Sequence, residues 1–379
     1  MKIQIDAGLL WEMASTAAQA ISGKPFRPEY ECLYIRVSEE SGSPVMTVMG
    51  KDSGIAIARA TDKIIAVEDG EALIPAKLLL AFTKLMKGDV TLEVDGKLRC
   101  TMKCGAKKTS ISGMDPADFP SEFTAMQEPR MVKMGGAEFE KAVASTLHCV
   151  STDNGRMVLT GVNFAFDGER GFCEATGLDG FRMAISRIPA ETNETFNVTI
   201  PATFVKLIAK IIKDGKDVSF RFGNGVVIVD DYDTSIEASL LAGEYMDVHK
   251  IAFREGKMQA RVNAGELLDA VKVAMVAADT NKSLVLMNFE SDSAIHVTAN
   301  SEVSAAATDV YCDRIGEMDG GAVYIAFNGK YVEEALKAGM DYAGEVTMLA
   351  NAPSSPMAIL PVDRDDYYQL VLPVRTFNN

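Results

Sequence analysis

The sequence predicts an α+β fold made of three tandem copies of one module, each with two helices and an antiparallel sheet. Similar apolar helical runs begin at residues 74, 200 and 325, which are 126 and 125 residues apart. A second set of helix starts, at residues 7, 136 and 264, recurs after 129 and 128 residues. This shared period exceeds the roughly 20 to 50 residues of solenoid repeats, so each copy is long enough to hold its own core.

The elements of the copies follow the same order. In the first copy we expect helices at 7–21 and 76–86, strands at 32–37, 45–49 and 55–60, and a hairpin over 90–100 that turns at Asp95-Gly96. In the second copy the matching hairpin covers 218–229 and turns at Asn224-Gly225. In the third, strands at 345–350 and 357–361 flank a Pro/Ser turn. Segregated helices and antiparallel strands indicate an α+β module.

Length and composition agree with three domains. The chain has 379 residues, 47% of them hydrophobic and 24% charged, as in ordinary globular proteins of about 100 to 150 residues per domain. Polar stretches at 121–130 and 247–256 mark the junctions. We therefore predict domains at 1–128, 129–250 and 251–379.

Several protein classes are disfavoured by the sequence. No apolar run approaches the roughly 18 residues of a membrane span, and the first residues lack the features of a signal peptide, so we expect a cytoplasmic protein. The six cysteines show neither a paired framework nor a CxxC spacing, which favours a reducing compartment and no metal site. The three histidines are scattered, and no phosphate-binding loop is present, so we expect neither catalysis nor a cofactor.

Lysines are concentrated on two helices of an acidic chain. The net charge is −15, yet the second helix of the first copy carries Lys77, Lys84 and Lys87 and no acid. An apolar face is expected opposite these lysines, built from Leu78, Leu79, Phe82, Leu85 and Met86. The second helix of the second copy carries Lys206, Lys210 and Lys213 in one stripe. Each helix alone is compatible with an ordinary solvated face, but two equivalent stripes favour contact with phosphate that is indifferent to base sequence.

Three short motifs resemble a known family. They are Asp179–Ala184, Pro116–Pro120 and Leu370–Arg375, and their order and spacing resemble the bacterial sliding clamp, the beta subunit of DNA polymerase III. The resemblance implies a clamp fold that forms a ring as a head-to-tail homodimer, with helices around the hole and double-stranded DNA passing through it. It also implies a non-catalytic processivity factor for which the DNA polymerase III alpha subunit, other polymerases and the clamp-loader complex are partners.

The resemblance also implies DNA contacts. Lys24 and Arg156 match positions that family members use on DNA, and the two lysine stripes would face the hole. Met157-Val158 stands where some members have a pair of aromatic residues, so stacking on template bases is not expected. In the third copy Lys330 and Lys337 are accompanied by Glu333 and Glu334, which weakens the expectation of DNA contact there.

A pocket for partner peptides is implied between the second and third copies. Position by position, its wall would be Leu159, Leu178, Gly180, Arg182, Met183, Met246, Ile251, Leu370, Val371, Leu372, Pro373, Val374 and Arg375. Roughly half of these residues are equally explained as core, because alternate positions of a strand face inward. Phe181 replaces a histidine that is common in the family, and Phe377, in the tail after Arg375, is a candidate cover for the pocket.

Ring closure would join the first and third copies. The family's interface strand matches residues 108–112, with Thr109 and Ile111, and the facing helix end matches Ala277 and Ala278. Small alanines there favour weak closure. The alternative interpretation of the chain is a triplicated, non-enzymatic binding scaffold without a DNA role.

Overall fold

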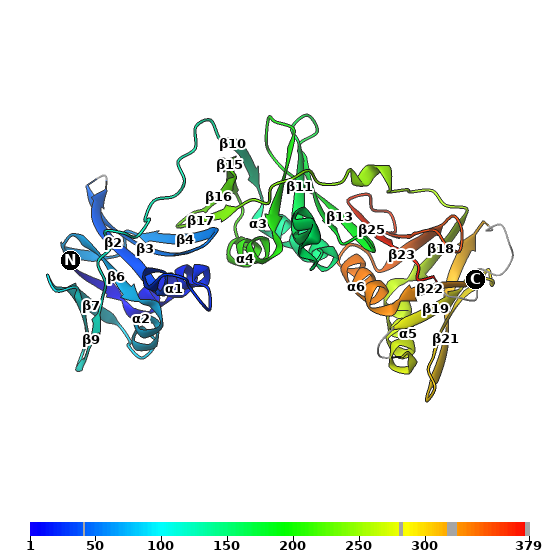
Figure 1. The fold of residues 1–379 in the computed structure, drawn as a ribbon, viewed down its shortest axis with the longest axis horizontal. Helices are drawn as coiled ribbons and strands as arrows, with labels where there is room; N and C mark the ends of the chain where they lie inside the picture. Colours follow the sequence, from blue (N-terminus) through cyan, green and yellow to red (C-terminus); the bar gives the residue numbers. More distant parts are fainter. Residues whose placement is uncertain (41, 280–282, 317–323, 376–379) are drawn as a thin grey trace. The chain divides into compact units, whose positions relative to one another are not determined.

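The six helices of the described chain begin where the two repeated sets of landmarks predict them. The computed structural model describes residues 1–40, 42–279, 283–316 and 324–375 (Figure 1). These residues form two compact units, one of residues 1–137 and 207–240, the other of residues 138–206 and 241 onward. The helices are α1 (Ala7–Ala17), α2 (Ala76–Thr83), α3 (Gly136–Thr146), α4 (Ala202–Ile212), α5 (Ala264–Ala277) and α6 (Gly329–Met340).

The first unit contains two antiparallel sheets. One has the strand order β5-β1-β7-β8-β9 and the other the order β10-β15-β16-β17-β4-β3-β2-β6. The first sheet is built from β1 (Lys2–Asp6), β5 (Ile65–Glu68), β7 (Asp89–Val94), β8 (Arg99–Cys104) and β9 (Lys107–Ser112). The second is built from β2 (Cys32–Glu40), β3 (Ser43–Asp52), β4 (Ile55–Thr61), β6 (Gly70–Pro75), β10 (Arg130–Met134), β15 (Val218–Gly223), β16 (Val226–Asp231) and β17 (Thr234–Ser239).

Turn chemistry sets both predicted hairpins of the first unit. Between β7 and β8 the Asp95 carboxylate accepts the backbone N–H groups of Lys97 and Arg99, at 2.9 and 3.0 Å. Between β15 and β16, Asn224 and Gly225 have φ of 50° and 75°, the left-handed conformation that a tight hairpin turn requires. The two predictions are confirmed.

Helix α2 is shorter than predicted, and this corrects its expected faces. The helix ends at Thr83, so Lys84 caps it and Lys87 lies beyond it. Leu79 is fully buried in the core that α1 and α2 share with both sheets, whereas Leu78 and Leu85 are 47% and 66% exposed. The expected five-residue apolar face is therefore wrong at these two leucines. Leu85 lies beyond the end of the helix, and Leu78 points in a different direction from its buried neighbour Leu79.

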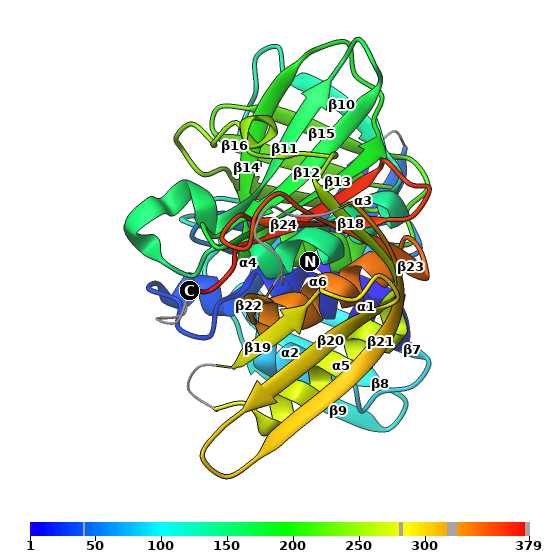
Figure 2. The same ribbon diagram turned by 90° about the vertical axis from the view of Figure 1, so that its right-hand side faces the viewer.

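The second unit is built on one sheet of twelve strands. Its order is β14-β11-β12-β13-β25-β24-β23-β18-β21-β20-β19-β22, and Figure 2 shows β19, β20 and β21 side by side. The strands are β11 (Gly161–Asp167), β12 (Phe172–Leu178), β13 (Arg182–Pro189), β14 (Phe196–Pro201), β18 (Met258–Asn263), β19 (Leu284–Asn288), β20 (Ala294–Asn300), β21 (Ala305–Ile315), β22 (Tyr324–Asn328), β23 (Glu345–Ala350), β24 (Met357–Pro361) and β25 (Tyr367–Val371).

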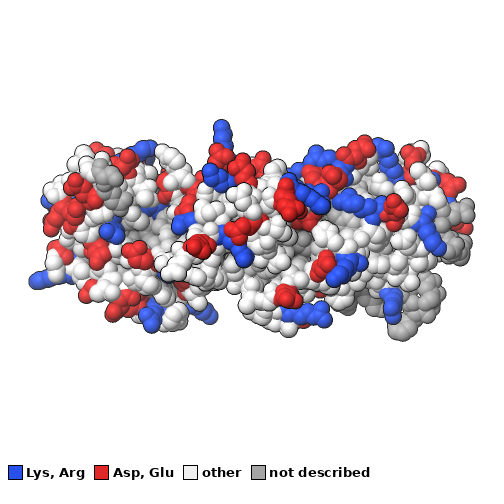
Figure 3. All heavy atoms as spheres, turned by 90° about the horizontal axis from the view of Figure 1, so that it is seen from above, with Lys and Arg blue, Asp and Glu red and all other residues white. Residues whose placement is uncertain are grey.

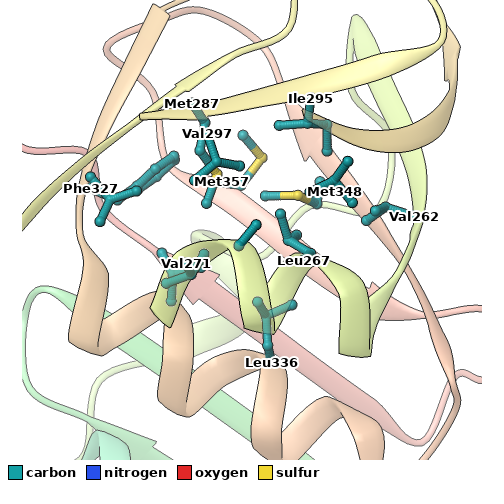
Figure 4. Close-up of a cluster of buried hydrophobic side chains, with 14 of the residues drawn as sticks. Val262, Leu267, Val271, Met287, Ile295, Val297, Phe327, Leu336, Met348 and Met357 are labelled. Atoms are coloured by element: carbon teal, nitrogen blue, oxygen red, sulfur yellow. The ribbon is translucent and has the colours of Figure 1, made fainter. Parts of the chain in front are cut away.

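Helices α5 and α6 close the core of the third copy. Their caps are alike: Asn263 accepts the N–H of Glu266, and Asn328 accepts the N–H of Lys330. Figure 4 shows Leu267, Val271 and Leu336 of these helices packed among strand residues such as Phe327 and Met348. All of these side chains are at most 2% exposed, so burial of apolar surface orders this copy.

The middle copy contributes one sheet to each unit. Its strand β17 pairs with β4 of the first copy, with Ile236 opposite Ile57. Its strand β13 pairs with β25 of the third copy, with Met183 opposite Leu370. Both junctions between copies are thus continuous antiparallel sheets.

A buried aromatic and hydroxyl network supports the second junction. The rings of Tyr342 and Tyr367 stack with centroids 4.2 Å apart. The Tyr342 hydroxyl lies 3.0 Å from Ser145 Oγ and 2.8 Å from Ser186 Oγ, and the Tyr367 hydroxyl donates to the Ser145 carbonyl at 2.9 Å. The network joins α3 and β13 of the middle copy to β25 and to the turn after α6 in the third.

No helix of the described chain is long and apolar enough to cross a membrane. Of the cysteines, five are buried and Cys104 is half-buried. Among the described residues, no cluster of three or more His, Cys, Asp or Glu side chains could hold a metal ion.

Candidate functional site

Four residues of the predicted peptide pocket pack in one apolar cluster of the second unit. They are Leu159, Leu178, Met183 and Leu370, each at most 6% exposed, with Leu372 packed against them. The cluster also contains Ile185, Val248, Leu349, Ala358, Leu360 and Tyr368. Strand alternation separates Val371, which lies in the core of the third copy. The prediction that Val371 forms part of the pocket wall is therefore wrong, because its side chain belongs to the core of the third copy.

Exposed apolar side chains come from the segments that border this cluster. We call them the rim: Met157, Phe181, Met246, Ile251 and Val374, which are 41% to 62% exposed. The Leu372 N–H donates to the Phe181 carbonyl at 2.8 Å, and the Val374 N–H donates to the Ala326 carbonyl at 2.7 Å. These bonds fix the segment after β25 against the turn before β13 and against β22. A buried apolar floor with an accessible apolar border suits a partner with apolar side chains.

The turn between β12 and β13 carries the motif Asp179-Gly180-Phe181-Arg182. Gly180 has a φ of 89°, which a side chain would strain. The Asp179 carboxylate accepts the N–H groups of Phe181 and Arg182 at 2.8 and 2.9 Å. The turn is therefore held by hydrogen bonds within the motif, with the Phe181 side chain outside.

Arg182 is engaged by its own chain. Its Nε donates to Asp179 Oδ2 at 3.0 Å and its Nη1 donates to Glu334 Oε2 of α6. Its guanidinium carbon lies 4.2 Å from the centroid of the Tyr331 ring. Only 10% of the side chain is exposed, so the arginine is a bridge between the middle and third copies.

Burial sets the protonation of groups beneath the turn. Desolvation lowers the pKa of His148, whose Nε2 lies 3.4 Å from Gln369 Oε1. Desolvation also raises the pKa of the Tyr245 hydroxyl and of the Cys149 thiol. At neutral pH these groups are uncharged, as a site for apolar side chains requires.

All eight predicted DNA-binding cations are at exposed positions. Lys24 lies between α1 and β2, and Arg156 lies in the 3₁₀ segment Asn154–Thr160. The others are Lys77, Lys84, Lys87, Lys206, Lys210 and Lys213. Figure 3 shows one face of the molecule, on which cations and carboxylates are interspersed. The eight exposed side chains are accessible to an anion.

Lys210 lies beside acidic groups of the first unit. Its Nζ donates to Gln19 Oε1 at 3.0 Å. It lines an open cavity with Glu12, Arg59, Asp231 and Asp233, of which Arg59 pairs with Glu12 and Asp233. Burial and the Asp233 charge raise the pKa of Asp231. The neighbouring carboxylates therefore weaken the positive electrostatic potential around Lys210.

Both acids of α6 are paired within the chain. Glu333 pairs with Lys337 at 2.6 Å, four residues along the helix, and Glu334 pairs with Arg182. Lys330 is exposed at the first turn. The acids that accompany the lysines of the third copy are therefore compensated by cations.

The predicted interface residues differ in accessibility. Ile111, Ala277 and Ala278 are buried in their own units, at 1%, 5% and 6% exposure. Thr109 lies on β9, an edge strand of its sheet, and its buried hydroxyl has no hydrogen-bond partner among the described residues. A contact here would therefore use the main chain of β9, since the three other side chains and the Thr109 hydroxyl are covered.

The sequence-based prediction of the pocket did not include two aromatic residues, Tyr368 and Tyr331, that the structure places at the site. Tyr368 shares the cluster face with Leu370, and the two-residue period of a strand would have identified it. Tyr331 gives no such signal, because only the tertiary placement of α6 brings its ring to Arg182. The predicted tail residues 376–379, Phe377 among them, lie outside the described residues.

Comparison with known proteins covers nearly the whole chain. Residues 1–123 match the N-terminal domain of the DNA polymerase III beta subunit, residues 133–247 its central domain, and residues 250–375 its C-terminal domain. The beta sliding clamp of Staphylococcus aureus is 25% identical over 354 residues, which are 90% of this chain and 91% of that protein.

Solved structures share the fold. The DNA polymerase sliding clamp of Bacillus subtilis superposes with a TM-score of 0.91 at 22% identity and covers 100% of both chains. The beta subunit of the Streptococcus pyogenes DNA polymerase gives a TM-score of 0.91 at 20% identity, over 99% of this chain and 100% of that one. With three successive domain matches along its length, the chain belongs to the DNA polymerase III beta subunit family, the bacterial sliding clamps.

Proposed function

We propose that this chain is a DNA polymerase processivity factor that encircles duplex DNA and tethers partner proteins through the apolar cluster and its rim. The observation that carries the DNA role is the exposure of all eight predicted cations on a chain of net charge −15. Such contacts neutralise phosphates without reading bases, which allows sliding. The protein is an accessory subunit without catalysis and works in the cytoplasm.

The ring is a head-to-tail homodimer of domains 1–128, 129–250 and 251–379. The position of β9 at the edge of its sheet supports a main-chain contact with the third domain of a second copy. The covered alanines add little apolar area, so closure relies on strand pairing and is readily reversed by a loader complex.

The peptide partners include the DNA polymerase III alpha subunit and other polymerases. Their motifs would place apolar and aromatic side chains on the rim. Aliphatic and methionine side chains adapt to varied anchors, which suits several partners at one site.

Retention on DNA tests the topological role. We expect the protein, loaded by a clamp loader, to remain on nicked circular DNA through gel filtration and to leave the same DNA once it is linearised. Light scattering should give a mass near twice 40.9 kDa. Equal loss from circles and linear DNA would contradict encirclement and favour the scaffold without a DNA role.

A charge-matched pair of variants tests the lysine stripe. Lys206→Glu, Lys210→Glu and Lys213→Glu together should shorten retention on circles, because three cations that face phosphate become anions. The control changes three exposed lysines outside the stripes, Lys63, Lys97 and Lys133, to Glu. Both variants change net charge equally, so equal effects would show that overall charge, and not this helix, determines DNA contact.

A further inference from the structure

We propose that Arg182 is a positioning residue, which holds the exposed Phe181 ring in place for a partner peptide and makes no peptide contact itself. The inference rests on the proposed peptide-binding function. It reassigns one residue of the predicted pocket wall and names Phe181 as a determinant of partner specificity.

The contacts of Arg182 leave little of the side chain for a ligand. Asp179 of its own turn and Glu334 of α6 each accept a hydrogen bond from the guanidinium, and the Tyr331 ring covers one face at 4.2 Å. The Asp179 and Glu334 side chains are themselves 12% and 29% exposed. A peptide carboxylate would have to displace one of these partners, which makes direct recognition by Arg182 unfavourable.

The backbone of Phe181 is fixed on both sides. Its N–H donates to Asp179 Oδ1 and its carbonyl accepts from the Leu372 N–H, each at 2.8 Å. Its side chain is nevertheless 62% exposed. An aromatic ring on an ordered backbone offers a large contact area at a low entropy cost, as binding anchors do.

Helix α6 provides the rigid support. Tyr331 and Glu334 are three residues apart and so lie on one helix face, while Val332 and Leu336 pack in the core of the third copy. Through Arg182 the turn of the middle copy is thus tied to a helix of the third. Asp179 alone would hold the turn internally but would not fix it against α6.

The peptide side chain that Phe181 selects would be apolar. Phe181 carries no charge, and the rest of the rim is Met157, Met246, Ile251 and Val374. We expect a branched aliphatic or aromatic side chain to pack against the ring, because polar groups would be desolvated there without a partner.

The test uses the full chain with Glu334→Gln, Arg182→Lys and the double variant. Arg187→Lys is the matched control, since Arg187 lies on the same strand, pairs with Glu174 at 2.8 Å and stacks on Phe172 at 4.6 Å. Amide hydrogen exchange over residues 179–183 reports on the turn without any ligand. Fluorescence anisotropy reports on binding of a labelled synthetic peptide that carries a leucine and a phenylalanine, with an alanine-substituted peptide for comparison.

We expect Glu334→Gln to speed exchange in the turn and to weaken peptide binding about fivefold, as when a charge-assisted hydrogen bond becomes a neutral one. Arg182→Lys should weaken binding similarly, and the double variant no further, because both changes break one link. Arg187→Lys should change neither readout.

Two results would overturn the positioning role. One is unchanged exchange in both single variants. The other is weaker binding in Arg182→Lys with normal binding in Glu334→Gln, which would make Arg182 a direct peptide contact. If the wild-type chain binds no peptide while Glu334→Gln still speeds exchange, the proposed peptide function fails and the tie between the turn and α6 stands.

Discussion

Removal of the Tyr342 hydroxyl from the junction between the middle and third copies should destabilise the protein, and further removal of the Ser186 hydroxyl should recover at least about half of the loss. Ser145 Oγ donates to the Ala142 carbonyl at 3.1 Å, so the Tyr342 hydroxyl donates to Ser145 and accepts from Ser186. Ser186 is fully buried. Tyr342→Phe keeps the ring stack on Tyr367 but leaves the Ser186 hydroxyl without an acceptor.

A buried donor left without a partner costs about 1 to 3 kcal/mol, whereas replacing both partners by apolar groups is nearly neutral. We therefore expect Tyr342→Phe to lower the free energy of unfolding by about 2 kcal/mol, and Tyr342→Phe with Ser186→Ala to recover at least about half of this loss.

Denaturant unfolding followed by far-UV circular dichroism measures both values. The single tryptophan, Trp11, lies in α1 of the first unit, so its fluorescence is an internal reference for that unit. A double variant less stable than Tyr342→Phe would refute the reasoning, since it would mean that Ser186 has another acceptor in the folded chain.

Three further outcomes follow from burial and packing. Burial raises the pKa of Cys32 to about 11 and that of Tyr368 to about 12. The unfolded chain therefore loses these protons at lower pH than the folded chain does. The stability of the fold, measured by thermal melting, should fall as pH rises above about 9. Burial lowers the pKa of His148, so the unfolded chain binds that proton first, and stability should decline as pH falls below about 6.5; His148→Gln should flatten this decline. Gly177→Ala should lower the free energy of unfolding by about 2 kcal/mol or more, because the new Cβ would lie 2.2 Å from the Thr146 carbonyl oxygen. Gly344→Ala is the control: a Cβ there would have no atom within 4 Å, so the melting temperature should stay unchanged.

The helix starts and hairpin turns could be predicted because they depend on local chemistry. Asp95 holds its turn through its own side chain, Asn224 and Gly225 adopt the left-handed conformation of theirs, and a repeated sequence marks the same helix start three times. The end of α2 could not be predicted, since no Gly or Pro directly follows Thr83 and the residues from Lys84 to Lys87 are compatible with a longer helix.

The site was partly predictable for a similar reason. The apolar residues from Leu370 onward predicted a buried strand, and the two-residue alternation of strand side chains predicted that about half of them face inward. The role of Arg182 could not be read from its neighbours, because Glu334 and Tyr331 are about 150 residues away and meet it only through tertiary packing. The same packing shows that Val371, one residue from Leu370, serves a different core.

The continuous sheets of the middle copy bear on how such a triplicated chain can change over time. Five residue pairs join β17 to β4 and five join β13 to β25. An excised middle copy would present two bare strand edges to solvent, and unpaired edges invite association with other chains. Because neighbouring copies share their sheets, a single copy could not be deleted or exchanged during evolution without exposing such edges. We therefore expect the three copies to be inherited together.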